Sequence, residues 1–177
     1  MPDAFSIRPA AHEFAPYYAR YVDRVPEGDI LHLLASQIDE TAALFGALSD
    51  AQAGYRYAPD KWSARQIVGH VSDAERVFLY RALAFARGET NALPSFDQNS
   101  YVANARFDER PIADLVAELR AVRASTLAFA RGLDGSELAR GGIASENPVT
   151  VRGLLYIIAG HELAHVAIYR ERYLSPA

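Results

Sequence analysis

The stretch Gly160-His161-Glu162-Leu163-Ala164-His165 lies inside a long apolar helical pattern that covers about residues 150–174. A helix turns by about 100° per residue, so His161 and His165 fall on the same stripe of this predicted helix. The stripe also carries three apolar residues: Leu154, Ile158 and Ile168. We therefore expect the stripe to face a core, with two imidazoles one turn apart pointing inward.

Three explanations compete for this pair of histidines. Both can be core residues whose polar atoms are satisfied by backbone or hydroxyl groups. They can also bind one metal ion together, because histidines at i and i+4 bring two ring nitrogens close to each other. Finally, the order His-Glu-x-x-His matches the zinc-protease motif, in which Glu162 would be the general base.

The zinc-protease explanation is the weakest of the three. That class normally needs a further metal ligand downstream, and only 12 residues follow His165, among which Glu171 stands at an unsuitable spacing. The sequence also predicts no strand that could hold a peptide by backbone pairing. Glu162 could still act as an acid or base, or orient a metal ligand, in a different kind of enzyme.

The composition narrows the class of protein. The chain has 177 residues, of which 50% are apolar and 23% are charged, which predicts one globular domain spanning residues 1–177. A net charge of -4 without a concentrated basic region argues against nucleic-acid binding. No secretory leader or membrane-spanning stretch is evident, so we expect a cytoplasmic protein without a membrane partner. Because the chain has no cysteine, a transition-metal site must use His, Asp or Glu.

Apolar periodicity predicts an all-α protein, a four-helix bundle with long connecting loops. The predicted helices cover about residues 29–48, 64–87, 111–132 and 150–174. Asp29 is expected to cap the first helix, and Ser63 with Gln66 forms a capping box for the second. Residues 1–28 are expected to form a proline-rich arm that packs on the bundle. The connections at 50–60 and 133–149 are expected to be irregular, and the one at 89–109 to cross one end of the bundle.

A third histidine belongs with the first two. His70 lies on the inward face of the second predicted helix, together with Ile67, Val71, Ala74, Val77, Phe78 and Arg81. If the two helices are neighbours, three neutral imidazoles can converge on one ion and leave coordination positions open. The alternative is three unrelated buried histidines, each with its own polar partners. His12 and His32 are expected to be solvated or to make local hydrogen bonds. Asp97 and Tyr101 are candidates for the edge of a pocket, and the alternative for both is that they stabilise the loop.

Several motifs together resemble the DinB-like superfamily of helical-bundle proteins, which includes YfiT-like metal-dependent hydrolases and bacterial thiol transferases. The resemblance runs from about Pro16 to Leu174. The motifs that carry it are Val25-Pro26-Glu27-Gly28-Asp29-Ile30, Tyr57-Ala58-Pro59-Asp60-Lys61-Trp62-Ser63, Gly69-His70-Val71-Ser72-Asp73-Ala74-Glu75-Arg76, Leu93-Pro94-Ser95-Phe96-Asp97 and Gly160-His161-Glu162-Leu163-Ala164-His165.

The resemblance implies a site, a cofactor and an assembly. The family's three histidine ligands match His70, His161 and His165, which would bind a divalent metal ion, with zinc or nickel the expected ions. A homodimer is the implied assembly. Related enzymes activate a low-molecular-weight thiol, such as bacillithiol or mycothiol, for transfer to an electrophile.

These observations lead to a functional hypothesis with two rivals. We expect a metal-dependent S-transferase or hydrolase that acts on a small molecule, with Glu162 as the candidate catalytic acid or base. The first rival is a non-catalytic, stress-associated protein that binds a metal or a ligand, and the second is a bundle without metal. An open pocket that reaches the histidines would favour the enzyme.

Overall fold

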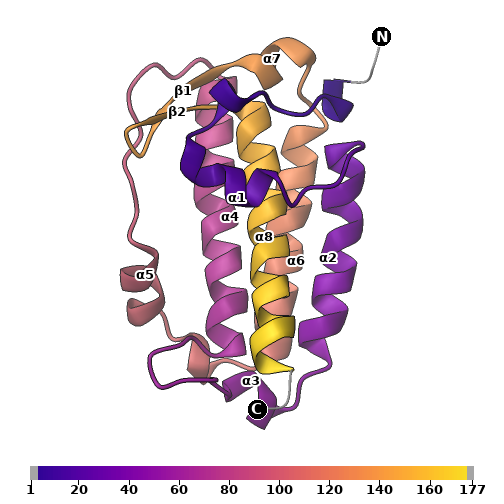
Figure 1. Ribbon diagram of the computed structural model, residues 1–177, viewed down its shortest axis with the longest axis vertical. Coiled ribbons are helices and arrows are strands. Elements are labelled where there is room, and N and C mark those ends of the chain that lie inside the picture. Colours follow the sequence, from indigo (N-terminus) through magenta and orange to yellow (C-terminus); the bar gives the residue numbers. More distant parts are fainter. Residues whose placement is uncertain (1–3, 175–177) are drawn as a thin grey trace.

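Four long helices run side by side along the length of the molecule (Figure 1). They are α2 (Ile30–Gly46), α4 (Ala64–Ala86), α6 (Ile112–Ala130) and α8 (Val151–Tyr173) in a computed structural model that describes residues 4–174. Each predicted helix is present, and the four-helix bundle is confirmed. The two predicted caps are also present: Asp29 accepts from the backbone of α2, and Ser63 and Gln66 form a reciprocal capping box on α4. In addition, the side chain of Thr150 caps α8.

The helix directions are unusual for a bundle, because α4 and α6 run parallel to each other while α2 and α8 run the opposite way (Figure 1). The connection between α4 and α6 must therefore return along the whole bundle. Leu93 donates to Ile143 O at one end, and the Phe107 ring lies against Gly69 at the other. The expectation that residues 89–109 cross one end is therefore wrong. This connection contains α5 (Gln98–Asn104) and the short 3-10 helix η4 (Phe107–Glu109).

The other connections are more ordered than the sequence suggested. The segment after α2 contains the short helix α3 (Asp50–Gly54), which a Ser49–Gln52 capping box begins. The segment before α8 contains α7 (Gly135–Ala139) and an antiparallel hairpin of β1 (Gly141–Ala144) and β2 (Asn147–Thr150). Ser145 and Glu146 turn the hairpin with positive φ angles of 51° and 64°, which match the right-handed twist of the two strands. The two connections are therefore not irregular throughout.

Residues 4–22 lie across the bundle in Figure 1. They form three 3-10 turns, η1 (Ala4–Ser6), η2 (Ala11–Glu13) and η3 (Pro16–Tyr18), followed by α1 (Ala19–Val22). The α1 segment packs on α8, and the carbonyl of Tyr21 lies against Gly160. A Cβ atom at residue 160 would overlap this carbonyl, so the glycine permits the close contact.

Helix α8 is buried along most of its length. Among residues 4–174 it is the one helix long and apolar enough to cross a membrane, but 72% of its apolar window is buried inside the protein, as expected of a core helix. The predicted inward stripe holds from Leu154 to His161 and ends before Ile168, which is 43% exposed. Ile168 is therefore not part of the core.

Candidate metal centre

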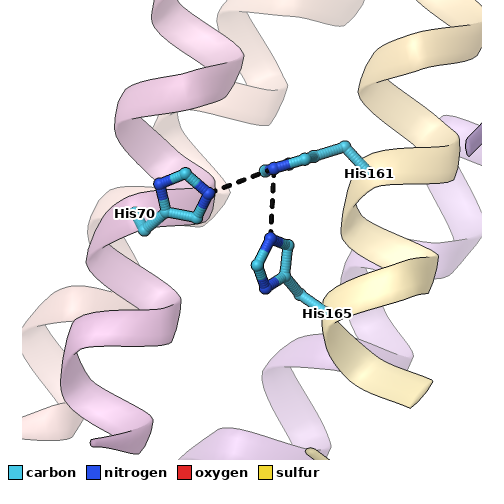
Figure 2. Close-up of side chains that lie close together, drawn as sticks. All are labelled: His70, His161 and His165. Atoms are coloured by element: carbon cyan, nitrogen blue, oxygen red, sulfur yellow. Dashed lines mark hydrogen bonds between the residues drawn. The ribbon is translucent and has the colours of Figure 1, made fainter. Parts of the chain in front are cut away.

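Three histidine side chains from two helices, α4 and α8, meet between these helices (Figure 2). His70 comes from α4, and His161 and His165 come from successive turns of α8. The Nε2 atom of His161 lies 3.1 Å from Nε2 of His70 and 3.1 Å from Nε2 of His165. The three potential ligand atoms lie within 4.8 Å of one another. We call these residues the histidine cluster.

Hydrogen bonding alone does not explain this arrangement. A neutral imidazole Nε2 carries either one hydrogen or one lone pair, so it can make one good hydrogen bond. His161 Nε2 faces two other ring nitrogens at 3.1 Å. Nitrogens that share a metal ion at about 2.0–2.1 Å lie roughly 3 Å apart. The donor atoms of the histidine cluster therefore fit one divalent ion.

The environment keeps all three rings neutral. Burial lowers the pKa of His70 to about 3, with a smaller contribution from His165. Burial, with help from the charge of Arg20, lowers the pKa of His165 to about 4. The pKa of His161 is held well below its usual value, first by burial and then by the neighbouring histidines. Because neutral imidazole is the form that binds metal, the cluster is ready to act as a ligand set at neutral pH.

Close packing fixes the two helices that carry the histidines. A glycine directly precedes the first histidine of each helix, Gly69 on α4 and Gly160 on α8. A Cβ at Gly69 would overlap the ring of Phe107, and a Cβ at Gly160 would overlap the backbone of Tyr21. The two glycines therefore let neighbouring segments approach the cluster closely.

Aromatic side chains surround the cluster and leave it accessible. The Trp62 ring lies 4.7 Å from the His70 ring, and the Tyr21 ring lies 5.2 Å from the His161 ring. A pocket of about 270 Å³ reaches His165, with Trp62 in its wall. A second pocket, of about 200 Å³, reaches His161. Small molecules can therefore approach the cluster from two sides.

The remaining candidate residues differ in their positions. Asp97 lines the pocket that reaches His161, and it also caps α5 by accepting from the backbone of Asn99. Tyr101 lines neither of these two pockets; it packs against Phe96 and borders a different one. His12 and His32 are exposed, and neither belongs to the metal-binding group found among residues 4–174.

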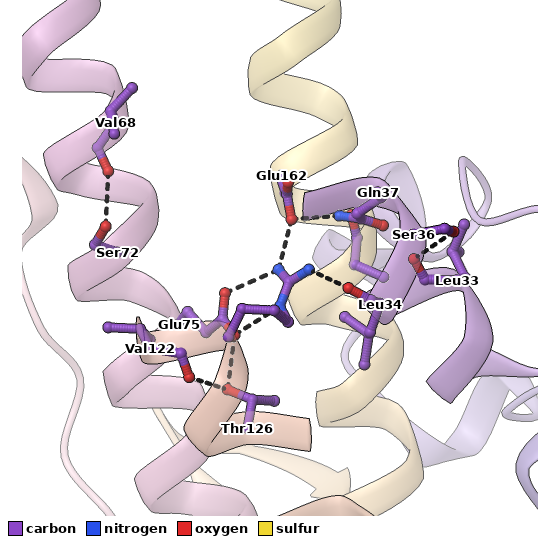
Figure 3. Close-up of polar contacts among 12 residues, drawn as sticks. Leu33, Leu34, Ser36, Gln37, Val68, Ser72, Glu75, Val122, Thr126 and Glu162 are labelled. Carbon is purple, nitrogen blue, oxygen red and sulfur yellow. Dashed lines mark hydrogen bonds and ion pairs between the residues drawn. The ribbon is translucent and has the colours of Figure 1, made fainter. Parts of the chain in front are cut away.

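Glu162 belongs to a second polar group, which Figure 3 shows. Its Oε2 atom accepts from Gln37 Nε2 and from Arg123 Nη2, each at 2.5 Å. Arg123 also donates through Nε and Nη2 to the two carboxylate oxygens of Glu75, at 2.8 and 2.9 Å, and Thr126 donates to Glu75 at 2.7 Å. We call these five residues the charged cluster.

The charged cluster was not predicted, although the sequence contained a signal for it. Arg123 and Thr126 lie on the apolar face of α6, where Leu119, Val122 and Leu127 are buried. Arg123 is 1% exposed and Glu75 is 2% exposed. Burial alone would lower the pKa of Arg123, but the charges of Glu162 and Glu75 outweigh burial and raise it. A charged residue on an apolar face predicts a buried partner, and here the partners come from α4 and α8.

Comparison with known proteins identifies the family. The model of the DinB superfamily matches residues 33–168, a range that contains all three clustered histidines. The chain therefore belongs to the DinB superfamily.

A solved structure shows the same fold. YfiT from Bacillus subtilis superimposes with a TM-score of 0.70 over 94% of this chain and 91% of its own, at 18% sequence identity. YfiT is described as a probable metal-dependent hydrolase with an unusual four-helix bundle topology. At this identity the likeness concerns the fold. No curated protein matches the sequence.

Proposed function

We propose that the protein binds a divalent metal ion through Nε2 of His70, His161 and His165 and is a metal-dependent enzyme that acts on a small molecule. The observation that carries this proposal is the convergence of three neutral ring nitrogens at a place that two pockets reach. Membership of the DinB superfamily and the fold shared with YfiT agree with it.

The ligand count supports catalysis over a structural role. Structural metal sites are closed by four protein ligands, whereas catalytic sites keep a position open for water or substrate. Three histidines form the group found among residues 4–174, and pockets reach His161 and His165. When bound, a divalent ion lowers the pKa of a thiol or water and so supplies a nucleophile at neutral pH.

A thiol S-transferase or a hydrolase fits this chemistry. The chain has no cysteine, so a sulfur nucleophile has to come from a small-molecule thiol. The pocket at His165 also contains Lys61, Gln98 and Asn99, which offer donors for a polar substrate. The protein's own residues would bind and orient the substrate, and Trp62 and Tyr21 pack against the histidine rings. Zinc or nickel are the ions we expect.

Of the two roles expected for Glu162, its contacts support positioning. Its two partners, Gln37 and Arg123, come from α2 and α6, which carry none of the clustered histidines, and its Oε1 atom is enclosed. A carboxylate held this way cannot turn toward substrate without breaking an ion pair with Arg123. We propose that Glu162 fixes the rotation of α8 and thereby aims its neighbour, His161.

Metal content tests the site. Protein purified without a histidine tag or added metal, then incubated with zinc or nickel and desalted, should hold about one ion per chain by mass spectrometry of the elements. The His70→Ala/His161→Ala variant should hold none. His32→Ala, which changes an exposed histidine, is the matched control and should keep the ion. Full metal stoichiometry in the double variant would show that the proposed ligands are wrong.

Turnover separates the enzyme from a non-catalytic binder. The loaded protein should consume an electrophile only with thiol and metal together if it is an S-transferase, and an ester or amide without thiol if it is a hydrolase. Loss of either activity in His161→Ala, but not in His32→Ala, would assign it to the cluster. A metal-loaded protein that turns over neither class would support the binding protein.

A further inference from the structure

A buried arginine outside the histidine cluster lacks an anionic partner. Arg81 on α4 is 2% exposed, yet no carboxylate among residues 4–174 pairs with it. Its Nη2 atom donates to Pro94 O at 2.7 Å and to Ser145 Oγ at 2.9 Å. The aromatic rings of Phe78 and Phe96 each lie 5.9 Å from its guanidinium carbon. Buried charges in proteins are normally paired, so this one calls for an explanation.

Two of the guanidinium nitrogens remain available. Within the described part of the chain, neither Nε nor Nη1 of Arg81 has a hydrogen-bond partner, and neither is among the fully enclosed atoms without one. Arg81 lines a pocket of about 290 Å³ between α4 and the α4–α6 connection. Free donors of a buried cation at a pocket wall are the usual arrangement for binding an anion.

The rest of this pocket is mostly apolar, with Ser95 among its lining residues, and no carboxylate lines it. Its walls include Val77, Tyr80, Leu93, Pro94, Phe96 and Tyr101. Arg76 also borders the pocket, but its charge is already compensated by Asp73 and Glu118. Arg81 therefore provides one uncompensated positive charge beside a surface that suits an aromatic or aliphatic group.

We propose that the Arg81 pocket binds an organic monocarboxylate with an apolar or aromatic body. The guanidinium fork matches a carboxylate in geometry and in its single charge. A phosphate monoester carries about -1.5 to -2 at neutral pH and would stay partly uncompensated at this site. The apolar walls would cover the body of the acid. No histidine lines the pocket, so this binding needs no metal and goes beyond the function proposed above.

Benzoate and benzamide are matched probes for this site, because they share a ring and differ in charge. The full chain is kept metal-free with a chelator, so that carboxylate binding to a metal cannot contribute. Titration followed by NMR or calorimetry should show saturable benzoate binding and little benzamide binding. Arg81→Gln, which keeps a donor for Pro94 O but loses the charge, should weaken the affinity for benzoate roughly tenfold or more. Arg76→Gln, the control, should change this affinity by less than about threefold.

Tyr101→Ala is a second variant, chosen because this side chain is 47% exposed and its loss should leave the fold intact. It should weaken benzoate binding and leave metal uptake by the histidines unchanged. The proposal is overturned if benzamide binds as well as benzoate, if Tyr101→Ala and Arg81→Gln both bind benzoate like the wild type, or if inorganic phosphate binds and benzoate does not. Because metal stoichiometry is measured separately, each of these results leaves the proposed metal site standing.

Discussion

The histidine cluster and the charged cluster meet on α8, where His161 belongs to one and the next residue, Glu162, to the other (Figures 2 and 3). The charged cluster is enclosed by the four long helices α2, α4, α6 and α8, and Arg123 is paired with the carboxylates of Glu75 and Glu162. The histidine cluster is neutral, brings three ring nitrogens together and opens to two pockets. A polar group that is complete without a ligand serves the fold, whereas a polar group that is incomplete and accessible serves binding.

Two oxygen atoms of the charged cluster lack a hydrogen-bond partner within the described residues. They are Glu162 Oε1 and Gln37 Oε1, and both are buried. Two acceptors of this kind suit an internal water, which typically makes about three hydrogen bonds to buried polar groups. Even so, the ionic pairing of Arg123 with both carboxylates is intact, so the cluster's main effect should be on stability.

Arg123→Met should produce the largest effect. It leaves the carboxylates of Glu75 and Glu162 buried without their cation, and the loss of one partner of a buried ion pair costs about 3–5 kcal/mol. Urea denaturation of the metal-free protein measures the change. The control is Arg120→Met on the same helix, which breaks an exposed pair with Asp39 and should cost less than about 1 kcal/mol.

A combined variant shows how much of the stability lost in Arg123→Met comes from the unpaired charges and how much from altered packing. Arg123→Met with Glu75→Gln and Glu162→Gln removes all three charges, so most of the stability lost in Arg123→Met should return. If Arg123→Met costs no more than Arg120→Met, the charged cluster does not stabilise the fold as its closed geometry implies.

Acid should destabilise the protein through the histidine cluster. The unfolded chain protonates histidine below about pH 6.5, while burial keeps the pKa of His70 near 3 and that of His165 near 4 in the folded protein. The unfolded state therefore binds more protons in this range, and stability falls as the pH falls. Three histidines predict a loss of about 3 kcal/mol between about pH 6.5 and 5.5 in metal-free protein.

The double variant His70→Ala/His161→Ala provides the comparison for this pH dependence. Only one clustered histidine remains in this variant. Its loss of stability between about pH 6.5 and 5.5 should therefore be about one third of that of the wild type. Denaturation curves at each pH, with a chelator present, measure both proteins. An equal loss in the two proteins would mean that the histidine cluster is not the group that titrates.

Local signals predicted the helices well and the connections poorly. Asp29, Ser63 with Gln66, and Thr150 mark helix starts through short-range hydrogen bonds, and these are present. The hairpin before α8 has four-residue strands containing Gly141 and Pro148, which show no alternating pattern. The parallel arrangement of α4 and α6 could not be predicted, because apolar periodicity identifies a buried face but gives no direction for the helix.

The site was predictable to the extent that it depends on helical periodicity. His161 and His165 are one turn apart, and His70 lies on an inward face, so their meeting required only that α4 and α8 be neighbours. Glu162 follows His161 by about 100° around the helix, and this rotation turns it toward α2 and α6. Its pairing with Arg123 depends on how α6 is aligned with α8, and the sequence does not reveal that alignment.

The smallest expected effect concerns how the two clusters are covered. Helices enclose the charged cluster, whereas the arm and the α4–α6 connection reach the histidine cluster through the contacts at Gly160 and Gly69. Gly160→Ala should displace the backbone of Tyr21 and cost about 1–3 kcal/mol. Gly69→Ala should cost less, because a Phe107 side chain can move more easily than a backbone.

Gly46→Ala is the matched control, since nothing lies within 4 Å of a Cβ there, and a helical glycine replaced by alanine gains up to about 1 kcal/mol. Hydrogen exchange should locate the difference. In Gly160→Ala, protection should fall in residues 16–22 while α6 around Arg123 stays protected, because the arm covers only the histidine cluster. Equal loss of protection around both clusters would mean that the arm supports the whole bundle and that the two clusters are not covered independently.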